Sequence, residues 1–154
     1  MRMPNMMVTT FAIILVVGLL GFYWRDDDSV ADGEIGLQVG VPIQHALQAG
    51  AKITPMPIVL RLVNNTDTVA ALTADGPCKL FRYVITTDDG SFIQAVRSPE
   101  VCNETITRGA IAERDVVEEI RQVPLDTARY RPGAYKIQVK FWNYQGQAEF
   151  QLTE

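Results

Sequence analysis

The sequence predicts a mainly β protein in which a single N-terminal transmembrane helix precedes an antiparallel β-sandwich of about seven strands. Two observations support this fold class. The first is an uncharged, largely apolar run over residues 6–24. The second is a series of short segments from residue 55 onward in which apolar and polar residues alternate. Turn-forming Asn, Asp, Gly and Pro separate them at intervals of roughly 8–12 residues, the spacing typical of a sandwich.

Residues 6–24 are long enough to cross a membrane. At about 1.5 Å per residue, a helix of this length spans roughly 28 Å, close to the thickness of the hydrocarbon core. The run ends in Phe22, Tyr23 and Trp24, whose aromatic side chains favour the lipid headgroup region. A cleaved signal peptide is the alternative, with Ser29-Val30-Ala31 as the cleavage site, but a charged segment separates that site from the apolar run. We therefore expect an uncleaved anchor that contacts the bilayer through residues 6–24.

The charges around this run predict its orientation. Arg2 and the α-amino group precede it within a short tail, so we expect residues 1–5 to be a cytoplasmic leader and the C-terminal part to be exported. Arginine is much more frequent than lysine, which is typical of a GC-rich bacterial genome. The predicted location is the bacterial inner membrane, with the C-terminal domain in the periplasm. Two glycosylation triplets, Asn64-Asn65-Thr66 and Asn103-Glu104-Thr105, leave a eukaryotic type II membrane protein as an alternative.

Residues 25–54 are predicted to be a linker or a docking arm, because they are rich in Gly, Ala, Gln and Asp. Within them, residues 35–41 alternate between apolar and small or polar side chains, which indicates a strand or an extended stretch that ends at Pro42. Residues 44–51 could form a short helical turn.

The strands of the sandwich are predicted over residues 55–154. Alternation is clearest in residues 135–141, where every odd position is apolar. Asp88-Asp89-Gly90 predicts the tight turn of a hairpin, and residues 143–146 predict another turn. The predicted strands are residues 58–63, 68–73, 78–87, 91–96, 104–107, 115–123, 135–141 and 147–152. Residues 113–122 could instead be helical, since they are rich in helix formers, but the neighbouring β segments favour a strand.

Two cysteines, Cys78 and Cys102, lie in the exported part. In an oxidising compartment, two thiols in one small domain usually pair, and a bridge here would stabilise the fold by roughly 3 kcal/mol in the chain-entropy model. Their spacing matches no zinc or haem motif. We expect a structural disulfide, with two buried free thiols as the alternative.

Two local patterns resemble bacterial immunoglobulin-like domains. One is the strand of residues 58–63 with the polar turn that follows it. The other is Arg131-Pro132-Gly133-Ala134-Tyr135, which is similar to a corner where a tyrosine hydroxyl bonds to upstream backbone. Together with Asp88-Asp89-Gly90, their order over residues 55–154 is similar to the BsuPI-type intracellular proteinase inhibitor domain. The resemblance implies an Ig-like β-sandwich and, as a function, the binding of a peptide or protease.

The sequence offers little for catalysis. The only histidine, His45, lies ahead of the predicted sandwich, and no motif for zinc, copper, nucleotide or phosphate binding is present. Glu118 and Glu119 would point to opposite faces of a strand, which argues against a glycosidase pair. The net charge of −4 and the lack of a basic cluster argue against nucleic-acid binding. We expect neither enzymatic activity nor a cofactor, a metal or a small-molecule substrate.

Aromatic and arginine side chains are the best candidates for protein contacts. Phe141 fits the core face of its strand, so Trp142 should point outward. An exposed Trp142 beside Tyr130 and Arg131 would form a protein-binding patch. The alternative is that residues 35–41 cover Trp142. Phe22, Tyr23 and Trp24 are further candidates, at the membrane surface.

These observations predict a non-enzymatic, membrane-anchored accessory subunit whose exported sandwich binds and stabilises a larger integral membrane protein complex. A respiratory or photosynthetic complex is plausible, because such assemblies contain small single-span subunits. The first alternative is an inhibitor-like module that binds a peptide or protease through residues 98–108. The second is a transient assembly factor.

Overall fold

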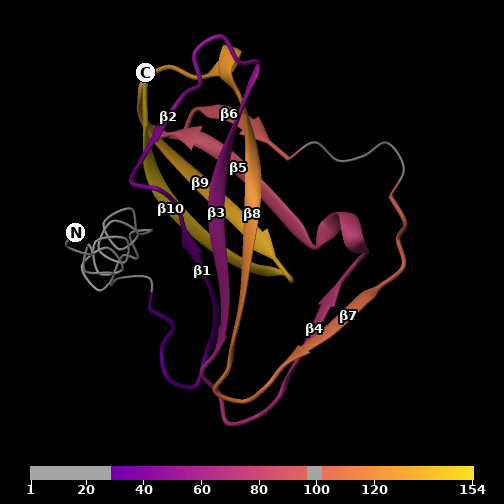
Figure 1. Cartoon of the computed structure of the whole chain (residues 1–154). Helices are drawn as coiled ribbons and strands as arrows, with labels where there is room; N and C mark the ends of the chain where they lie inside the picture. Colours follow the sequence, from indigo (N-terminus) through magenta and orange to yellow (C-terminus); the bar gives the residue numbers. More distant parts are fainter. Residues whose placement is uncertain (1–28, 97–101) are drawn as a thin grey trace, which may run out of the picture.

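The computed structural model describes residues 29–96 and 102–154, which form ten strands and two 3₁₀ turns (Figure 1). The predicted transmembrane segment, with Phe22, Tyr23 and Trp24, lies outside these residues. Among the residues that are described, no helix is long and apolar enough to span a bilayer. The elements are β1 (Ile35–Gly40), β2 (Gln44–Ala46), β3 (Ile53–Asn64), β4 (Ala70–Ala74), η2 (Pro77–Lys79), β5 (Phe81–Thr87), β6 (Phe92–Ala95), β7 (Thr107–Ile111), β8 (Val116–Asp126), η3 (Thr127–Arg129), β9 (Gly133–Phe141) and β10 (Tyr144–Thr153).

Two sheets form the layers of a β-sandwich-like fold, and a two-stranded ribbon stands beside them (Figure 1). The first sheet has the strand order β1-β3-β8, and the second has the order β2-β10-β9-β5-β6. The ribbon consists of β4 and β7. Neighbouring strands are antiparallel except β2, which runs parallel to β10. The predicted mainly β, antiparallel fold is confirmed, with more strands than the seven expected.

The core lies between the two sheets because alternate residues of each strand point inward. The first sheet contributes aliphatic side chains, and the second adds most of the aromatic ones. Their burial supplies the main favourable term of folding. The principal core residues are Leu37, Val39, Met56, Ile58, Leu60, Leu62, Val123 and Leu125 from the first sheet, and Tyr83, Ile85, Tyr135, Ile137, Val139, Phe141, Phe150 and Leu152 from the second.

β1 is part of the sandwich. It pairs with β3 from Ile35↔Asn64 to Gly40↔Val59, and alternate β1 side chains enter the core. The strand predicted for residues 35–41 is therefore confirmed, whereas the predicted domain boundary at residue 55 falls inside β3. Residues 44–46 form β2, where a helical turn was the expectation. Gly36, Gln38 and Gly40, which belong to the predicted linker, alternate with the core residues along β1.

Two prolines in β3 explain where β1 ends. Pro55 pairs with Pro124 of β8, and Pro57 pairs with Gln122. Because proline has no N–H, its nitrogen is best placed at an edge without a ladder partner. β1 pairs with β3 only as far as Val59, so no described strand lies along this edge of β3 at the prolines. The chain instead turns at Pro42 and joins the second sheet as β2.

β8 forms the strand that was predicted, and not the alternative helix. It pairs with β3 from Val63↔Val116 to Ile53↔Asp126, so a long partner strand outweighs the local helix propensity. The boundaries of three other strands differ from the sequence prediction. β7 begins at Thr107 and not at residue 104, a 3₁₀ turn precedes β5, and β10 begins at Tyr144.

Candidate functional site

The ribbon is fixed to the sandwich at one end by a buried asparagine. Asn64 has no exposed surface, and its Nδ2 donates to Thr68 O (2.9 Å) and Ala112 O (2.9 Å), while its Oδ1 accepts from Thr66 N (3.0 Å). A third carbonyl, Ile111 O, lies 3.3 Å from Nδ2. The segments that enter β4 and leave β7 are thereby tied to the end of β3. The first glycosylation triplet is thus part of the internal hydrogen-bond network.

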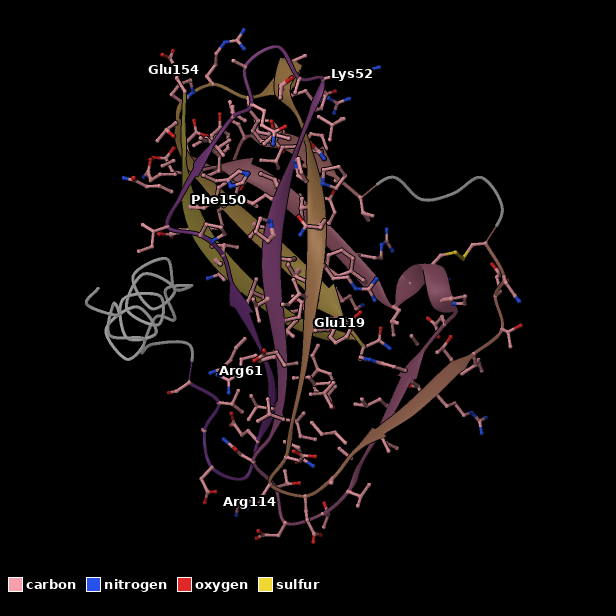
Figure 2. The ribbon with its side chains drawn as sticks, in the orientation of Figure 1. Lys52, Arg61, Arg114, Glu119, Phe150 and Glu154 are labelled. Atoms are coloured by element: carbon pink, nitrogen blue, oxygen red, sulfur yellow. A yellow bond between two sulfur atoms is a disulfide. The ribbon has the colours of Figure 1, made fainter. Side chains whose placement is uncertain are left out.

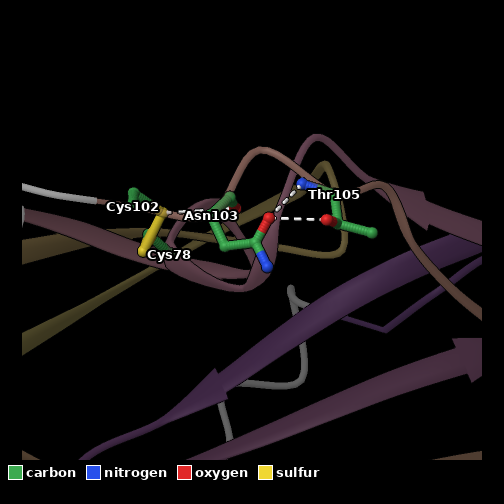
Figure 3. Close-up of a disulfide and its surroundings, with 4 residues drawn as sticks. All are labelled: Cys78, Cys102, Asn103 and Thr105. Carbon is green, nitrogen blue, oxygen red and sulfur yellow. Dashed lines mark hydrogen bonds between the residues drawn. A yellow bond between two sulfur atoms is a disulfide. The ribbon is translucent and has the colours of Figure 1, made fainter.

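The other end of the ribbon carries the disulfide, which confirms the predicted pairing. Cys78 and Cys102 are bridged, with their Cα atoms 6.0 Å apart (Figure 3). The bond lies away from the two main sheets, beyond the end of the ribbon (Figure 2). Beside it, Asn103 Oδ1 accepts from Thr105 N (2.9 Å) and Thr105 Oγ1 (2.5 Å), which folds the chain before β7 (Figure 3).

The turn between β9 and β10 holds the middle of the ribbon. Trp142 and Asn143 have φ values of 49° and 67°, the left-handed conformation of a two-residue hairpin turn. The indole lies against β7, because a Cβ added to Gly109 would meet Trp142 Cη2 at 3.1 Å. Asn143 Nδ2 donates to Thr73 O of β4 (2.8 Å). Trp142 is therefore half-buried and covered in part by the ribbon.

The outer strand of the ribbon is exposed. β7 has β4 as its neighbour, and no described strand lies along its other edge. Arg108, Gly109 and Ala110 are exposed in succession, and Ile106 before them has 57% of its surface accessible. An exposed apolar residue next to an unpaired strand edge is typical of a surface to which another chain can add.

Tyr130 and Arg131 lie at the opposite end of β9 from Trp142, so the three predicted residues do not form one patch. Tyr130 is only 1% exposed. The predicted tyrosine corner is present: Tyr135 Oη donates to Arg131 O (2.9 Å) and accepts from Arg131 N (3.1 Å). Arg131 and Tyr130 thus help to hold the start of β9, and a partner contact for exposed Arg131 stays a prediction.

A glutamine joins the edges of the two sheets near this corner. Gln94 of β6 donates from Nε2 to Pro124 O (2.6 Å) and Tyr83 Oη (3.2 Å). Its Oε1 accepts from Asp126 N (3.2 Å) and Tyr130 Oη (3.0 Å). Burial raises the pKa of both tyrosines above the ordinary phenol value. Both phenols are therefore neutral at physiological pH and suit a structural role.

An ion cluster lies at the root of the ribbon, which is the end that Asn64 attaches to β3. Arg114 pairs with Asp67 (2.7 Å from Nε) and with Asp32, which precedes β1. The hydrogen bond from Arg114, followed by its charge, lowers the pKa of Asp67. The cluster links the segment before β1 to the β3–β4 and β7–β8 connections.

The remaining sequence candidates do not form a catalytic group. His45 lies on β2 opposite Leu152, with its Nε2 buried and no hydrogen-bond partner for it among the described atoms. Glu118 and Glu119 point to opposite faces of β8 and pair with Arg61 and Arg121, respectively. Over the described ranges, no three His, Cys, Asp or Glu side chains are grouped to hold a metal ion.

The comparison with protein-family models finds no match for this chain, and the comparison with curated proteins finds none either.

Proposed function

We propose that this protein is a non-enzymatic, membrane-anchored accessory subunit whose exported domain binds a larger integral membrane protein complex. The outer edge of β7 is the contact surface, and it is the observation that carries the proposal. An unpaired edge with exposed apolar neighbours can accept a strand from another protein, because main-chain hydrogen bonds supply affinity and side-chain pockets supply specificity. The Cys78–Cys102 disulfide supports an oxidising, exported compartment for the domain.

The register of the ribbon indicates which groups face the partner. Thr73 O accepts from Asn143, so the backbone groups of Thr73 point away from β7. Thr73 pairs with Arg108, and Ala71 pairs with Ala110 two residues along. In an antiparallel ladder, alternate pairs turn their N–H and C=O groups outward, so Arg108 and Ala110 present theirs to the open edge of β7.

The position of the ribbon fits a membrane-bound partner. The segment before β1 is attached at the ribbon's root, where Gly33 N donates to Asn65 O (2.8 Å) and Asn65 Nδ2 donates to Val30 O (2.6 Å). Between residue 24 and residue 29 the chain can reach at most roughly 17 Å. An anchor at residues 6–24 would therefore hold the root of the ribbon close to the bilayer surface.

The test is co-purification of the full chain from membranes in mild detergent, followed by native gel electrophoresis and mass spectrometry. We expect a stoichiometric integral membrane partner with the unmodified chain. Ala110→Pro removes one outward N–H of β7 without removing a bond of the β4–β7 ladder, so it should release the partner. Ala110→Val keeps the N–H and favours a strand, so it is the matched control and should retain the partner.

Monomeric migration of the unmodified chain would argue against the proposal, as would equal retention by Ala110→Pro and Ala110→Val at equal melting temperatures. A partner found only during assembly of a complex would instead identify a transient assembly factor.

A second candidate function is inhibitor-like binding of a protease. The exposed side chain of Ile106 follows Cys102 closely, and a disulfide that restrains such a segment suits insertion into a protease cleft. This candidate covers the predicted residues 98–108, of which residues 98–101 lie outside the described part. Inhibition of a protease by the full chain, lost in Ile106→Asp, would favour it over the accessory subunit.

A further inference from the structure

The outer face of the second sheet has a hollow on the opposite side from the core. Its volume is about 460 Å³, and side chains of β5, β9 and β10 form its floor. This volume falls within the range of small-molecule sites, which is about 300–1,000 Å³. The hollow is separate from the ribbon, so the inference goes beyond the proposed function.

Two rows of side chains lie across this face. In the first row, Lys140 of β9 stands between Arg82 of β5 and Gln145 of β10. The second row has Gln138 of β9 between its two cross-strand partners, Val84 and Gln147. Side chains that are directly opposite on neighbouring strands have Cβ atoms about 5 Å apart, so each row presents its groups together. All six side chains are exposed.

The charges of the first row are not balanced locally. Arg82 and Lys140 are a directly opposed pair of cations, an arrangement that destabilises a sheet. Lys136, on the same face of β9, does have a neighbouring negative charge. Its cross-strand partner Glu149 forms a salt bridge with it at 3.7 Å. Within residues 29–96 and 102–154, neither Arg82 nor Lys140 has a salt bridge. The first row therefore concentrates positive charge on a chain whose net charge is −4.

We propose that this hollow binds the oxyanion of a small polar ligand. The guanidinium of Arg82 and the ammonium of Lys140 bind a carboxylate or phosphate by charge-assisted hydrogen bonds. The amides of Gln138, Gln145 and Gln147 each donate and accept, which suits the hydroxyl groups of a sugar. An acidic sugar, carrying either a carboxylate or a phosphate, matches both groups of side chains. The molecule is a bound ligand, and no reaction is assigned to it.

The site stands on regular strands. β9 is paired on both sides in this region, by β5 and by β10, so the spacing of the five polar side chains is set by the ladder. Sites built on rigid strands hold their geometry better than sites on loops. The repulsion between Arg82 and Lys140 is relieved when an anion lies between them.

The experiment is titration of the isotope-labelled full chain, in zwitterionic detergent, with glucuronate and with glucose 6-phosphate, and with glucose as the neutral control. NMR follows the side-chain amides of Gln138, Gln145 and Gln147 and the Nε–H of Arg82. We expect one or both anions to shift these signals with a dissociation constant of about 1 mM or lower, and glucose to leave them unchanged. The anion with the lower dissociation constant shows whether the oxyanion of the ligand is a carboxylate or a phosphate.

Three variants sharpen the result. Arg82→Gln and Lys140→Gln should each weaken anion binding by at least about tenfold and raise the melting temperature of the ligand-free protein, because the repulsion is removed. Lys136→Gln makes the same change of charge on the same face and should alter binding less than about twofold. The proposal is overturned if neither anion shifts the signals at about 10 mM. Equal weakening by Lys136→Gln and Lys140→Gln would also overturn it, since binding would then depend only on overall charge.

Discussion

Two amide side chains, the buried Asn64 and the half-buried Gln94, connect parts of this protein that backbone ladders do not join. Asn64 uses its amide to attach both strands of the ribbon to β3, and Gln94 uses its amide to connect the edge of one sheet to the edge of the other. In each case the carbonyl oxygen and the NH₂ group both have partners. Removing either amide side chain leaves several of its partners without a hydrogen bond at once. The cost in stability is therefore larger than that of losing a single hydrogen bond.

Gln94→Leu should lower the free energy of unfolding by about 2–4 kcal/mol, because Tyr130 Oη, Asp126 N and Pro124 O all lose a partner. Chemical denaturation of the full chain in detergent measures the change. Gln122→Leu on the exposed face of β8 is the control, and its effect should stay within about 0.5 kcal/mol. A similar small effect for both variants would show that the Gln94 bonds do not stabilise the fold.

The ion cluster at the root of the ribbon makes stability depend on pH. Because the folded protein lowers the pKa of Asp67 below its ordinary value of 3.8, the stabilisation is fully present above that value. It is lost as the pH falls through the lower folded pKa. Arg114→Gln should therefore raise the pKa of Asp67 toward 3.8, as NMR titration can measure, and its stability deficit should shrink at acidic pH.

Arg108→Gln is the matched control for this titration, since Arg108 is an exposed arginine on β7 and not a partner of Asp67. It should leave the pKa of Asp67 unchanged. An unchanged pKa in Arg114→Gln would contradict the assignment.

At the scale of elements, the ribbon is the part of the fold that depends most on specific attachments. It makes one strand pairing, and four features hold it: the Asn64 network, the Arg114 ion cluster, the β9–β10 turn and the disulfide. A two-stranded sheet alone is at best marginally stable in water. The ribbon should accordingly open before the two larger sheets.

Replacing Cys78 and Cys102 together by serine should lower the free energy of unfolding by roughly 3 kcal/mol, since the bridge closes a loop between residues 24 apart in sequence. Hydrogen exchange should become faster in β4 and β7 than in β3 and β9, because the ribbon opens locally while the core strands exchange only through global unfolding. Adding reductant to the unmodified chain should reproduce both effects. If exchange in β4 and β7 stayed as slow as in β9, the disulfide would stabilise the domain as a whole and not the ribbon in particular.

Strands with strong alternation were predictable, and those defined by a distant partner were not. β9 and β3 follow directly from the apolar positions that their residues repeat. β2 has three residues and exists because β10 offers it a parallel edge, which no local pattern indicates. β8 combines both effects, since its helix formers become a strand only beside β3.

At the scale of the whole molecule, the sequence predicts the mainly β class and the disulfide but not the candidate sites. From the sequence, an exposed Trp142 is expected to form a patch with Tyr130 and Arg131. The nine residues of β9 instead place them at opposite ends of the sandwich. The pairing of Arg82 with Lys140 depends on the register between β5 and β9, whose residues are far apart in the chain. Register is a property of the folded sheet, so neither the ribbon edge nor the hollow follows from the local sequence pattern.

The way in which β1 enters the sandwich has a mechanical consequence. β1 starts at the ribbon's root and runs away from it along β3, with its six residues paired from Ile35↔Asn64 to Gly40↔Val59. A force applied at residue 29 would pull β1 lengthwise against β3, so the hydrogen bonds of the β1–β3 ladder would resist together and not break one after another. Gly33 and Asp32 are attached ahead of this strand and would take the first part of the strain. The direction of β1 is therefore suited to withstand tension that is applied through the segment before it.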